Sequence, residues 1–241
     1  VNVAAIWGKS FSNGDGSAPM LNYLSSPVSI ASYFGDFLKP IMTLTDDYLN
    51  PFSGLIPDVI IPANKQFDYK NITSTTLHEL THAAHAKKAG RAFWAKVVAG
   101  ELNNMIGYGE PYGRISSSFS GAVGLAEAWA NDVENLMMYR LFGDASVYIS
   151  SYMENWYVKS NKDAINKWLP NGLFYDLFDS NGLYGVYERN ITDNVSGISY
   201  STLYSNLGGS TDNLSDYKNR LKNTFSANSS AIEELFNQYG F

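Results

Sequence analysis

The feature that most constrains this chain is a pair of histidines, His78 and His82, spaced four residues apart in a segment with strong helix signals. On a helix, this spacing places both imidazoles on one face, one turn apart, so that both can reach a single metal ion. Glu79 lies roughly 100° round the helix from His78, where it cannot readily bind the same ion but can reach a water molecule on it. The chain has only three histidines, and all of them lie on this segment. The pattern therefore predicts a metal site on one helix.

A catalytic zinc site needs a third protein ligand and one open position for water. His85 falls on the same helix face, but it lies seven residues from His78, which is roughly 10 Å along a straight helix. Donor atoms on one zinc ion are only about 3 to 3.5 Å apart, because the bonds are about 2.0–2.1 Å long. His85 is therefore expected beside the site rather than on the ion, and it is a reserve candidate for the ligand.

The favoured third ligand is Glu127, which lies in a helical segment among small residues that let a neighbouring helix approach closely. Asn131 follows one turn later and Glu134 two turns later, so both share the face of Glu127. A side chain one turn after the ligand can accept the free ring N–H of a metal-bound histidine and fix its tautomer, and we predict this role for Asn131. The competing interpretation is a solvated acidic face, which is common on amphipathic helices.

Capping and turn signals outline the helices around these residues. The first helix is expected from about residue 74 to 89, because Ser and Thr offer N-caps and Gly90 follows two lysines. Further helices are expected at 91–105 and 122–141, with a loop rich in Gly and Ser between them. The last two helices are expected at residues 212–225 and 230–239.

Two segments favour β-strands, residues 1–7 and residues 55–62. The proline at each end of the second segment suits an edge strand better than a central one. Between the strands, residues 26–49 have helical character with a break at Pro40. We therefore expect an α+β fold that is predominantly helical, with a small sheet, an active-site helix and a helical C-terminal lobe.

Composition narrows the possible partners and organisation. Lysine plus arginine number 17 against 23 aspartate plus glutamate, a net charge of −6 that argues against nucleic-acid binding. The absence of cysteine excludes disulfides and thiolate metal sites, and no apolar run approaches the roughly 18 residues of a membrane span. The length predicts a single domain, residues 1–241, in which an upper lobe (1–120) and a lower lobe (121–241) flank a cleft.

The pattern of His78-Glu79-x-x-His82 and a later Glu127, in an Ala-Glu-Ala-Trp-Ala-Asn context, resembles the gluzincin branch of the zincin metallopeptidases. The resemblance implies a zincin-like catalytic domain in which His78, His82 and Glu127 bind Zn²⁺. It also implies that Glu79 is the catalytic general base.

Further parts of the chain relate to the zincins less closely. The resemblance implies that the strand at residues 56–62 lines the substrate cleft and that Asn131 supports a ligand histidine. The Gly-Glu-Pro-Tyr-Gly run around Glu110 faintly resembles the aspzincin pattern, which makes Glu110 a second reserve ligand. The metzincin pattern fits badly, because it needs glycine and histidine where this chain has His85 and Lys88.

The resemblance implies a zinc metallopeptidase that hydrolyses peptide bonds in a peptide or protein substrate. In such enzymes a tyrosine or histidine helps to hold the oxyanion, and the candidates here are Tyr108, Tyr112, Tyr139 and Tyr148. The alternative is a zincin-like surface or binding module with a vestigial or non-peptidase metal site, and the intact Glu79 argues against a vestigial one. The abundance of tyrosine and the start of the sequence without a targeting segment favour a secreted, periplasmic or cell-surface protein.

Overall fold

The computed structural model describes residues 3–6, 59–62, 69–143, 153, 164–179, 191–208 and 210–241. Helices account for most of these residues. They are α3 (Tyr69–Ala89), α4 (Arg91–Tyr108), α5 (Ser120–Phe142), α7 (Leu173–Phe178), α8 (Tyr200–Asn206), α9 (Leu214–Thr224) and α10 (Ser229–Gln238), with a short 3₁₀ turn, η4, at Ser226–Asn228.

The three long helices confirm the helices expected in this part of the sequence, with small shifts at their ends. α3 begins at Tyr69 rather than near residue 74, and it ends before Gly90 as expected. α4 and α5 are followed directly by Gly109 and Gly143, which have φ angles of 72° and 68°. Glycine adopts this left-handed conformation without a steric penalty, so it ends a helix readily. The last two expected helices are confirmed by α9 and α10.

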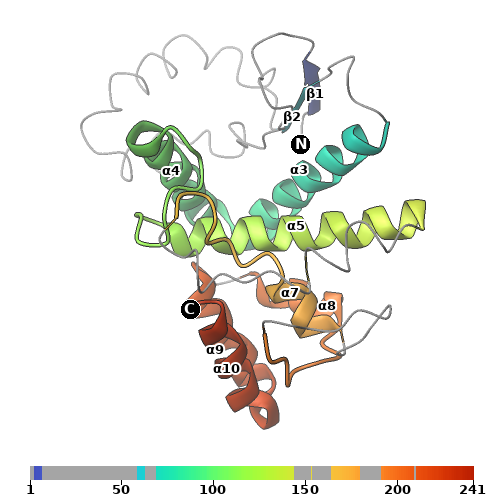
Figure 1. Ribbon diagram of the computed structural model, residues 1–241, viewed down its shortest axis with the longest axis vertical. Coiled ribbons are helices and arrows are strands. Elements are labelled where there is room, and N and C mark those ends of the chain that lie inside the picture. Colours follow the sequence, from blue (N-terminus) through green and yellow to red (C-terminus); the bar gives the residue numbers. More distant parts are fainter. Residues whose placement is uncertain are drawn as a thin grey trace.

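The long helix α5 crosses the middle of the molecule and separates two groups of helices (Figure 1). α3 and α4, which are joined through Gly90, lie on one side of α5 and contact both it and each other. The shorter helices α7 to α10 lie on the other side, where α7 and α9 contact α5. A side chain on α5 is therefore placed between two layers of helices.

The first half of α5 suits this central position because it is apolar almost all round. Residues 122–130 are buried without exception, and most of them are small. At Gly124, an added Cβ would stand 2.9 Å from the Trp168 ring and 3.0 Å from Leu214, so this close approach requires glycine. Although α5 is so apolar, none of the helices in the described ranges is long and apolar enough to cross a membrane.

The expected α+β class is wrong, because the described residues form an all-α fold. Both predicted strand segments do contain a strand, β1 (Val3–Ile6) and β2 (Val59–Pro62), and these pair in parallel, with β2 beside α3. Two strands of four residues are too small to form a layer of the core. The core is instead built by helices on both sides of α5. The predicted helical segment at 26–49 lies outside the described residues.

A buried carboxylate, Asp132, extends from α5 towards α7 and α8. Asp132 is 1% exposed, and its carboxyl group lies close to Asp179 and Tyr200. Burial raises the pKa of the Asp132 carboxyl to about 8, and the negative charge of Asp179 adds to this rise. Asp132 therefore keeps its proton in the folded protein at neutral pH.

The pKa of Asp132 predicts how stability depends on pH. The folded-state value lies above the 3.8 of an ordinary aspartate, so between these values the folded protein binds one more proton than the unfolded chain. The free energy of unfolding should therefore fall as the pH rises from about 4 to about 8, with a slope from this group of up to roughly 1.4 kcal/mol per pH unit. Asp132→Asn should remove this slope and be more stable than the wild type above about pH 8, in urea unfolding at several pH values.

Asp212→Asn is the control, because Asp212 is a partly exposed residue paired with Lys96. This variant should keep the wild-type slope. Parallel curves for the wild type and Asp132→Asn would contradict the assignment.

Candidate metal centre

The candidate site lies where α3 crosses α5. Tyr69, at the start of α3, packs edge-on against Phe142, at the end of α5, with ring centroids 5.6 Å apart. The two helices therefore run in opposite directions. The small side chains of α5 allow α3 to approach closely, and this places the histidine face of α3 against Glu127.

The donor atoms of three residues converge at this crossing. The ring Nε2 atoms of His78 and His82 are 3.0 Å apart. Oε1 of Glu127 lies 3.1 Å from Nε2 of His82, and Oε2 lies 3.5 Å from Nε2 of His78. Donor atoms that share one tetrahedral ion, with bonds of about 2.0–2.1 Å, have this same separation. The three residues could therefore hold a metal ion.

A second carboxylate, Glu134, fixes the orientation of His78. Its Oε2 lies 3.0 Å from Nδ1 of His78, and its Oε1 accepts a hydrogen bond from the hydroxyl of Ser74. Burial acts to lower the pKa of His78, but hydrogen bonds and the negative charges of Glu127 and Glu134 outweigh it and hold this pKa well above the usual value. Once the proton on Nε2 is lost, the proton held on Nδ1 by Glu134 leaves Nε2 available to a metal.

Asn131, which the sequence predicted to support a ligand histidine, contacts Asn171 instead: its Nδ2 donates a hydrogen bond to Oδ1 of Asn171 at 3.0 Å. The side chain on α5 that contacts Nδ1 of His78 is that of Glu134. The reason is helix geometry. Seven residues make almost two full turns, so Glu134 lines up with Glu127, whereas a residue four positions on is rotated by roughly 40°.

Glu79 is buried beside the triad and is 5% exposed. Within the described residues, its Oε2 has no hydrogen-bond partner. Burial is the main cause that raises the pKa of Glu79, and the charges of Glu127 and Glu134 add to it, while those of His82 and His78 oppose it. A carboxylate in this position is suited to accept a proton from a water molecule near the triad.

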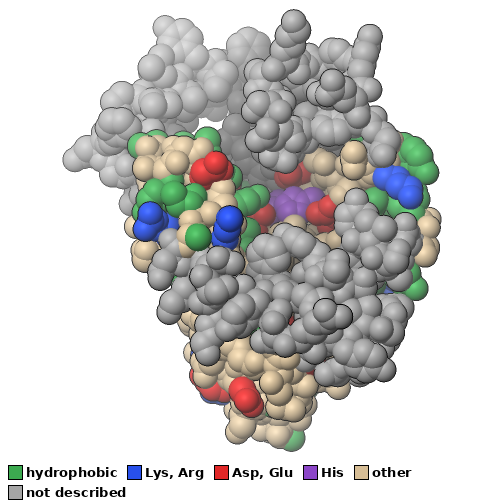
Figure 2. Space-filling model, viewed as in Figure 1, with side chains coloured by type: hydrophobic (Ala, Val, Ile, Leu, Met, Phe, Trp, Pro, Cys, Tyr) green, Lys and Arg blue, Asp and Glu red, His purple; other side chains and the backbone are tan. Residues whose placement is uncertain are grey.

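Glu101, the single acidic residue of α4, was not predicted from the sequence. Burial raises its pKa well above the usual value, the charges of Glu127 and Glu79 raise it further, and His78 opposes them. Glu101 therefore shares the electrostatic environment of the triad and Glu79. Figure 2 shows histidine side chains at the surface on one face of the molecule, with acidic side chains on both sides of them. A single acid directly after the apolar residues 97–100 was the signal that could have identified Glu101.

The two reserve ligands, His85 and Glu110, do not join the triad in the structure. His85 is fully buried against Phe93, with ring centroids 4.8 Å apart. Burial lowers the pKa of His85 to about 3, and the charge of His82 adds to this effect, so His85 is a neutral residue of the core. Glu110 is exposed and accepts a hydrogen bond from Asn166 at 2.6 Å.

Among the four candidate tyrosines, Tyr112 is the one whose surroundings include the triad within the described ranges. The charge of Glu127 is the main cause that raises the pKa of Tyr112 well above its usual value, and burial and the charges of Glu101 and Glu79 add to it. Tyr108 is 41% exposed, and Tyr139 packs against a small separate cluster. Tyr148 lies outside the described residues.

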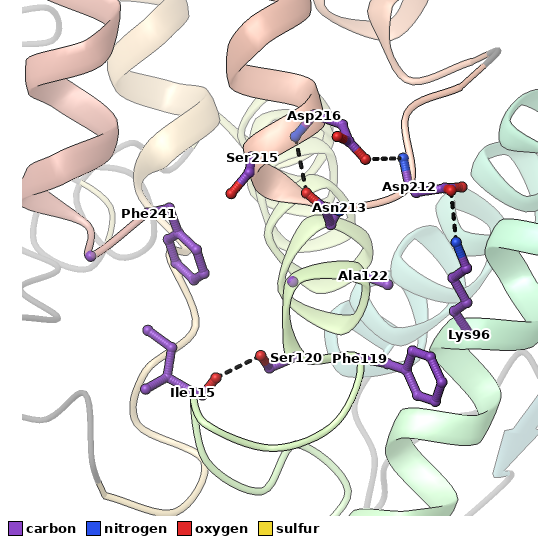
Figure 3. A pocket seen from close by; sticks show the side chains of 12 residues that line it. Lys96, Ile115, Phe119, Ser120, Ala122, Asp212, Asn213, Ser215, Asp216 and Phe241 are labelled. Atoms are coloured by element: carbon purple, nitrogen blue, oxygen red, sulfur yellow. Dashed lines mark hydrogen bonds and ion pairs between the residues drawn. The ribbon is translucent and has the colours of Figure 1, made fainter.

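A separate cavity of about 560 Å³ lies between the starts of α5 and α9 and the end of the chain (Figure 3). At its edge Lys96 forms an ion pair with Asp212 at 2.7 Å, and Asn213 accepts a hydrogen bond from the N–H of Asp216 at 2.9 Å. Its lining contains no residue of the triad. The polar groups named here are already paired, so we interpret this cavity as a junction between helices.

No family model matches the chain, and no curated protein or solved structure is significantly similar to it. The case for a function therefore depends on the geometry and chemistry of the site.

The contact between Glu134 and His78 predicts a measurable effect on metal binding. Glu134→Gln removes the charge that holds the proton on Nδ1, so the affinity for Zn²⁺ should fall by roughly 10- to 100-fold, measured by competition with a chromophoric chelator. Asn131→Ala is the matched control from the same helix and should leave the affinity unchanged. The opposite ranking of the two variants would restore Asn131 to the role that the sequence predicted.

Proposed function

We propose that the protein is a zinc-dependent peptidase whose metal is bound by His78, His82 and Glu127. The observation that carries the proposal is the convergence of their donor atoms, with separations of 3.0 to 3.5 Å, beside the buried carboxylate of Glu79. Two imidazole nitrogens and one carboxylate oxygen form a donor set that suits zinc. Three protein ligands also leave the fourth tetrahedral position for water, as catalytic zinc requires.

The residues around the triad suit the hydrolysis of an amide bond. Zinc bound there would lower the pKa of a water molecule and polarise the carbonyl group of the substrate. Glu79 accepts the proton of that water and then delivers it to the nitrogen of the leaving amine. The raised pKa of Glu79 supports the first step, because a more basic carboxylate is a better acceptor for the proton of the water. Glu134 keeps the His78 ring in the orientation that metal binding needs.

The alternative, a surface or binding module with a vestigial or non-peptidase metal site, receives less support. Exposed aromatic side chains would suit such a module, but two aromatic residues of α7 are buried: Phe174 is fully buried and Tyr175 is 2% exposed. Phe174 packs against Trp129, with ring centroids 5.1 Å apart. These rings therefore contribute to the core rather than to a surface for sugars or peptides.

Metal content tests the ligand set. Elemental analysis should find about one zinc ion per chain in the wild type, because a site with three protein ligands binds one ion. Glu127→Gln should lose most of the metal, since an amide is a poor ligand for zinc, and the exposed control Glu110→Gln should keep it. Equal zinc in both variants would show that Glu127 is not a ligand, and no zinc even after zinc is added would refute the proposal.

Glu79→Gln tests the catalytic step. The variant should keep its zinc, because Glu79 is not a ligand, but hydrolysis should fall by roughly 10²- to 10⁴-fold, since the proton acceptor is lost. The measurement is cleavage of a diverse peptide mixture, followed by mass spectrometry, with Glu110→Gln as the control that stays active. Cleavage by Glu79→Gln at the wild-type rate would exclude Glu79 as the general base.

A further inference from the structure

Beside the triad, His82 and His85 of α3 lie against the start of α4. The ring of His82 packs against that of Trp94, with centroids 5.6 Å apart. His85 follows His82 by three residues on α3, so their side chains are neighbours on one face of the helix. The ring of His85 lies 4.8 Å from that of Phe93, the residue before Trp94. Two histidines on one turn of α3 therefore face two successive aromatic residues of α4.

Four ring nitrogens in this region have no hydrogen-bond partner within the described residues. They are Nδ1 of His82, Nδ1 and Nε2 of His85, and Nε1 of Trp94. The three residues are 5%, 0% and 3% exposed, so these atoms are shielded from bulk solvent. Folded proteins satisfy nearly all buried polar groups, and they use internal water where no protein group serves. Four such atoms on neighbouring rings therefore point to a bound molecule.

The chemistry of these atoms determines what that molecule must offer. Nε2 of His82 faces Nε2 of His78 at 3.0 Å and Oε1 of Glu127 at 3.1 Å, so a metal bound there leaves the proton of the His82 ring on Nδ1. The indole nitrogen of Trp94 can only donate. His85 is neutral, because burial lowers its pKa to about 3, and a neutral imidazole has one donor and one acceptor nitrogen. Three N–H donors therefore share a single acceptor.

Water meets this requirement, because it accepts two hydrogen bonds and donates its own protons. A water molecule between the rings can accept from Nδ1 of His82 and Nε1 of Trp94, and it can donate to the acceptor nitrogen of His85. Internal water molecules typically make about three hydrogen bonds to buried groups that have no other partner. A metal cation does not suit this position, because two of the three groups present N–H protons to it.

We propose that His85 is a positioning residue of the metal centre: together with Trp94 it binds an internal water molecule that accepts the Nδ1 proton of His82. The inference rests on the proposed function only in that the triad binds zinc; it does not depend on peptide hydrolysis. The water fixes the tautomer and the ring orientation of His82, as the carboxylate of Glu134 does for His78 at 3.0 Å. Each histidine ligand then has its own hydrogen-bond partner on Nδ1.

The first measurement is the zinc affinity of three variants, by competition with a chromophoric chelator. His85→Phe keeps an aromatic ring but removes both nitrogens, so the affinity should fall by roughly 10-fold or more. His85→Gln keeps a donor and an acceptor, and it should restore most of this loss. Trp94→Phe removes the indole N–H, and it should weaken binding by less than His85→Phe does, because His82 and His85 still hold the water.

Nuclear magnetic resonance of the zinc-loaded wild type gives a readout that packing alone would not change. Long-range proton–nitrogen correlations should place the proton of His82 on Nδ1. The indole proton of Trp94 should show cross-relaxation with a long-lived water molecule, since a water with three protein partners exchanges slowly with solvent. This water signal should be lost in His85→Phe.

Tyr217→Phe is the matched control, because it also removes one buried polar group from an aromatic ring. The hydroxyl of Tyr217 donates to the carbonyl oxygen of Leu203 at 3.0 Å, and its ring packs against Phe174, with centroids 5.3 Å apart. Tyr217 belongs to α9, on the opposite side of α5 from α3 (Figure 1). The control should lower the melting temperature and leave the zinc affinity unchanged. Circular dichroism of each variant establishes that it is folded.

The outcomes are distinct. Wild-type zinc affinity in a folded His85→Phe, or equal losses in His85→Phe and His85→Gln, would overturn the inference, because hydrogen bonding at residue 85 would then have no effect. A Trp94 indole proton without a water signal in the zinc-loaded wild type would also overturn it, even if no variant at residue 85 folds. A wild-type protein that binds no zinc would refute the proposed function itself, whereas a protein that binds zinc and gives either of the other results would refute the water site alone.

Discussion

Glu127 is 3% exposed, and an ionised carboxylate buried so deeply must be paired, because an isolated buried charge costs several kcal/mol. His78 and His82 supply the partners from α3. Burial opposes the ionisation of Glu127, but the charge of His82 and hydrogen bonds from both histidines hold the pKa of Glu127 below its usual range. The antiparallel packing of α3 on α5, in the register that brings these groups together, is the constraint on which the site depends.

The part of this arrangement that could be predicted from the sequence is local. The spacing of His78 and His82 determines that both lie on one helix face, and glycines such as Gly90 and Gly143 mark helix ends through their backbone freedom. Glu127 was predictable as a candidate because its neighbours are small enough for close helix packing. Each of these inferences depends on residues within a few turns of one helix, where sequence spacing and spatial position are directly related.

The rest depends on which helices meet, and spacing along one helix does not show that. The choice of Asn131 over Glu134 depended on the angle at which α3 crosses α5, and the electrostatic role of Glu101 depended on the packing of α4 beside them. Tyr112 is set by hydrogen bonds from residues more than fifty positions away. The α+β class was wrong for a related reason: a strand pattern shows where strands form, but not whether they build a layer of the core.

The negative charges around the triad bear directly on the binding of the proposed metal ion. Three carboxylates, Glu79, Glu101 and Glu134, surround that of Glu127, and Coulomb energies in a region of low dielectric are larger than in water. The raised pKa values of Glu79 and Glu101 reflect burial and this excess of negative charge, which protons can neutralise. A divalent cation at the triad would neutralise it in another way, because its charge lies against the same oxygen atoms. Protons and a metal ion would therefore compete for this site. A cluster of acids that is unfavourable without a counter-charge would favour a bound cation.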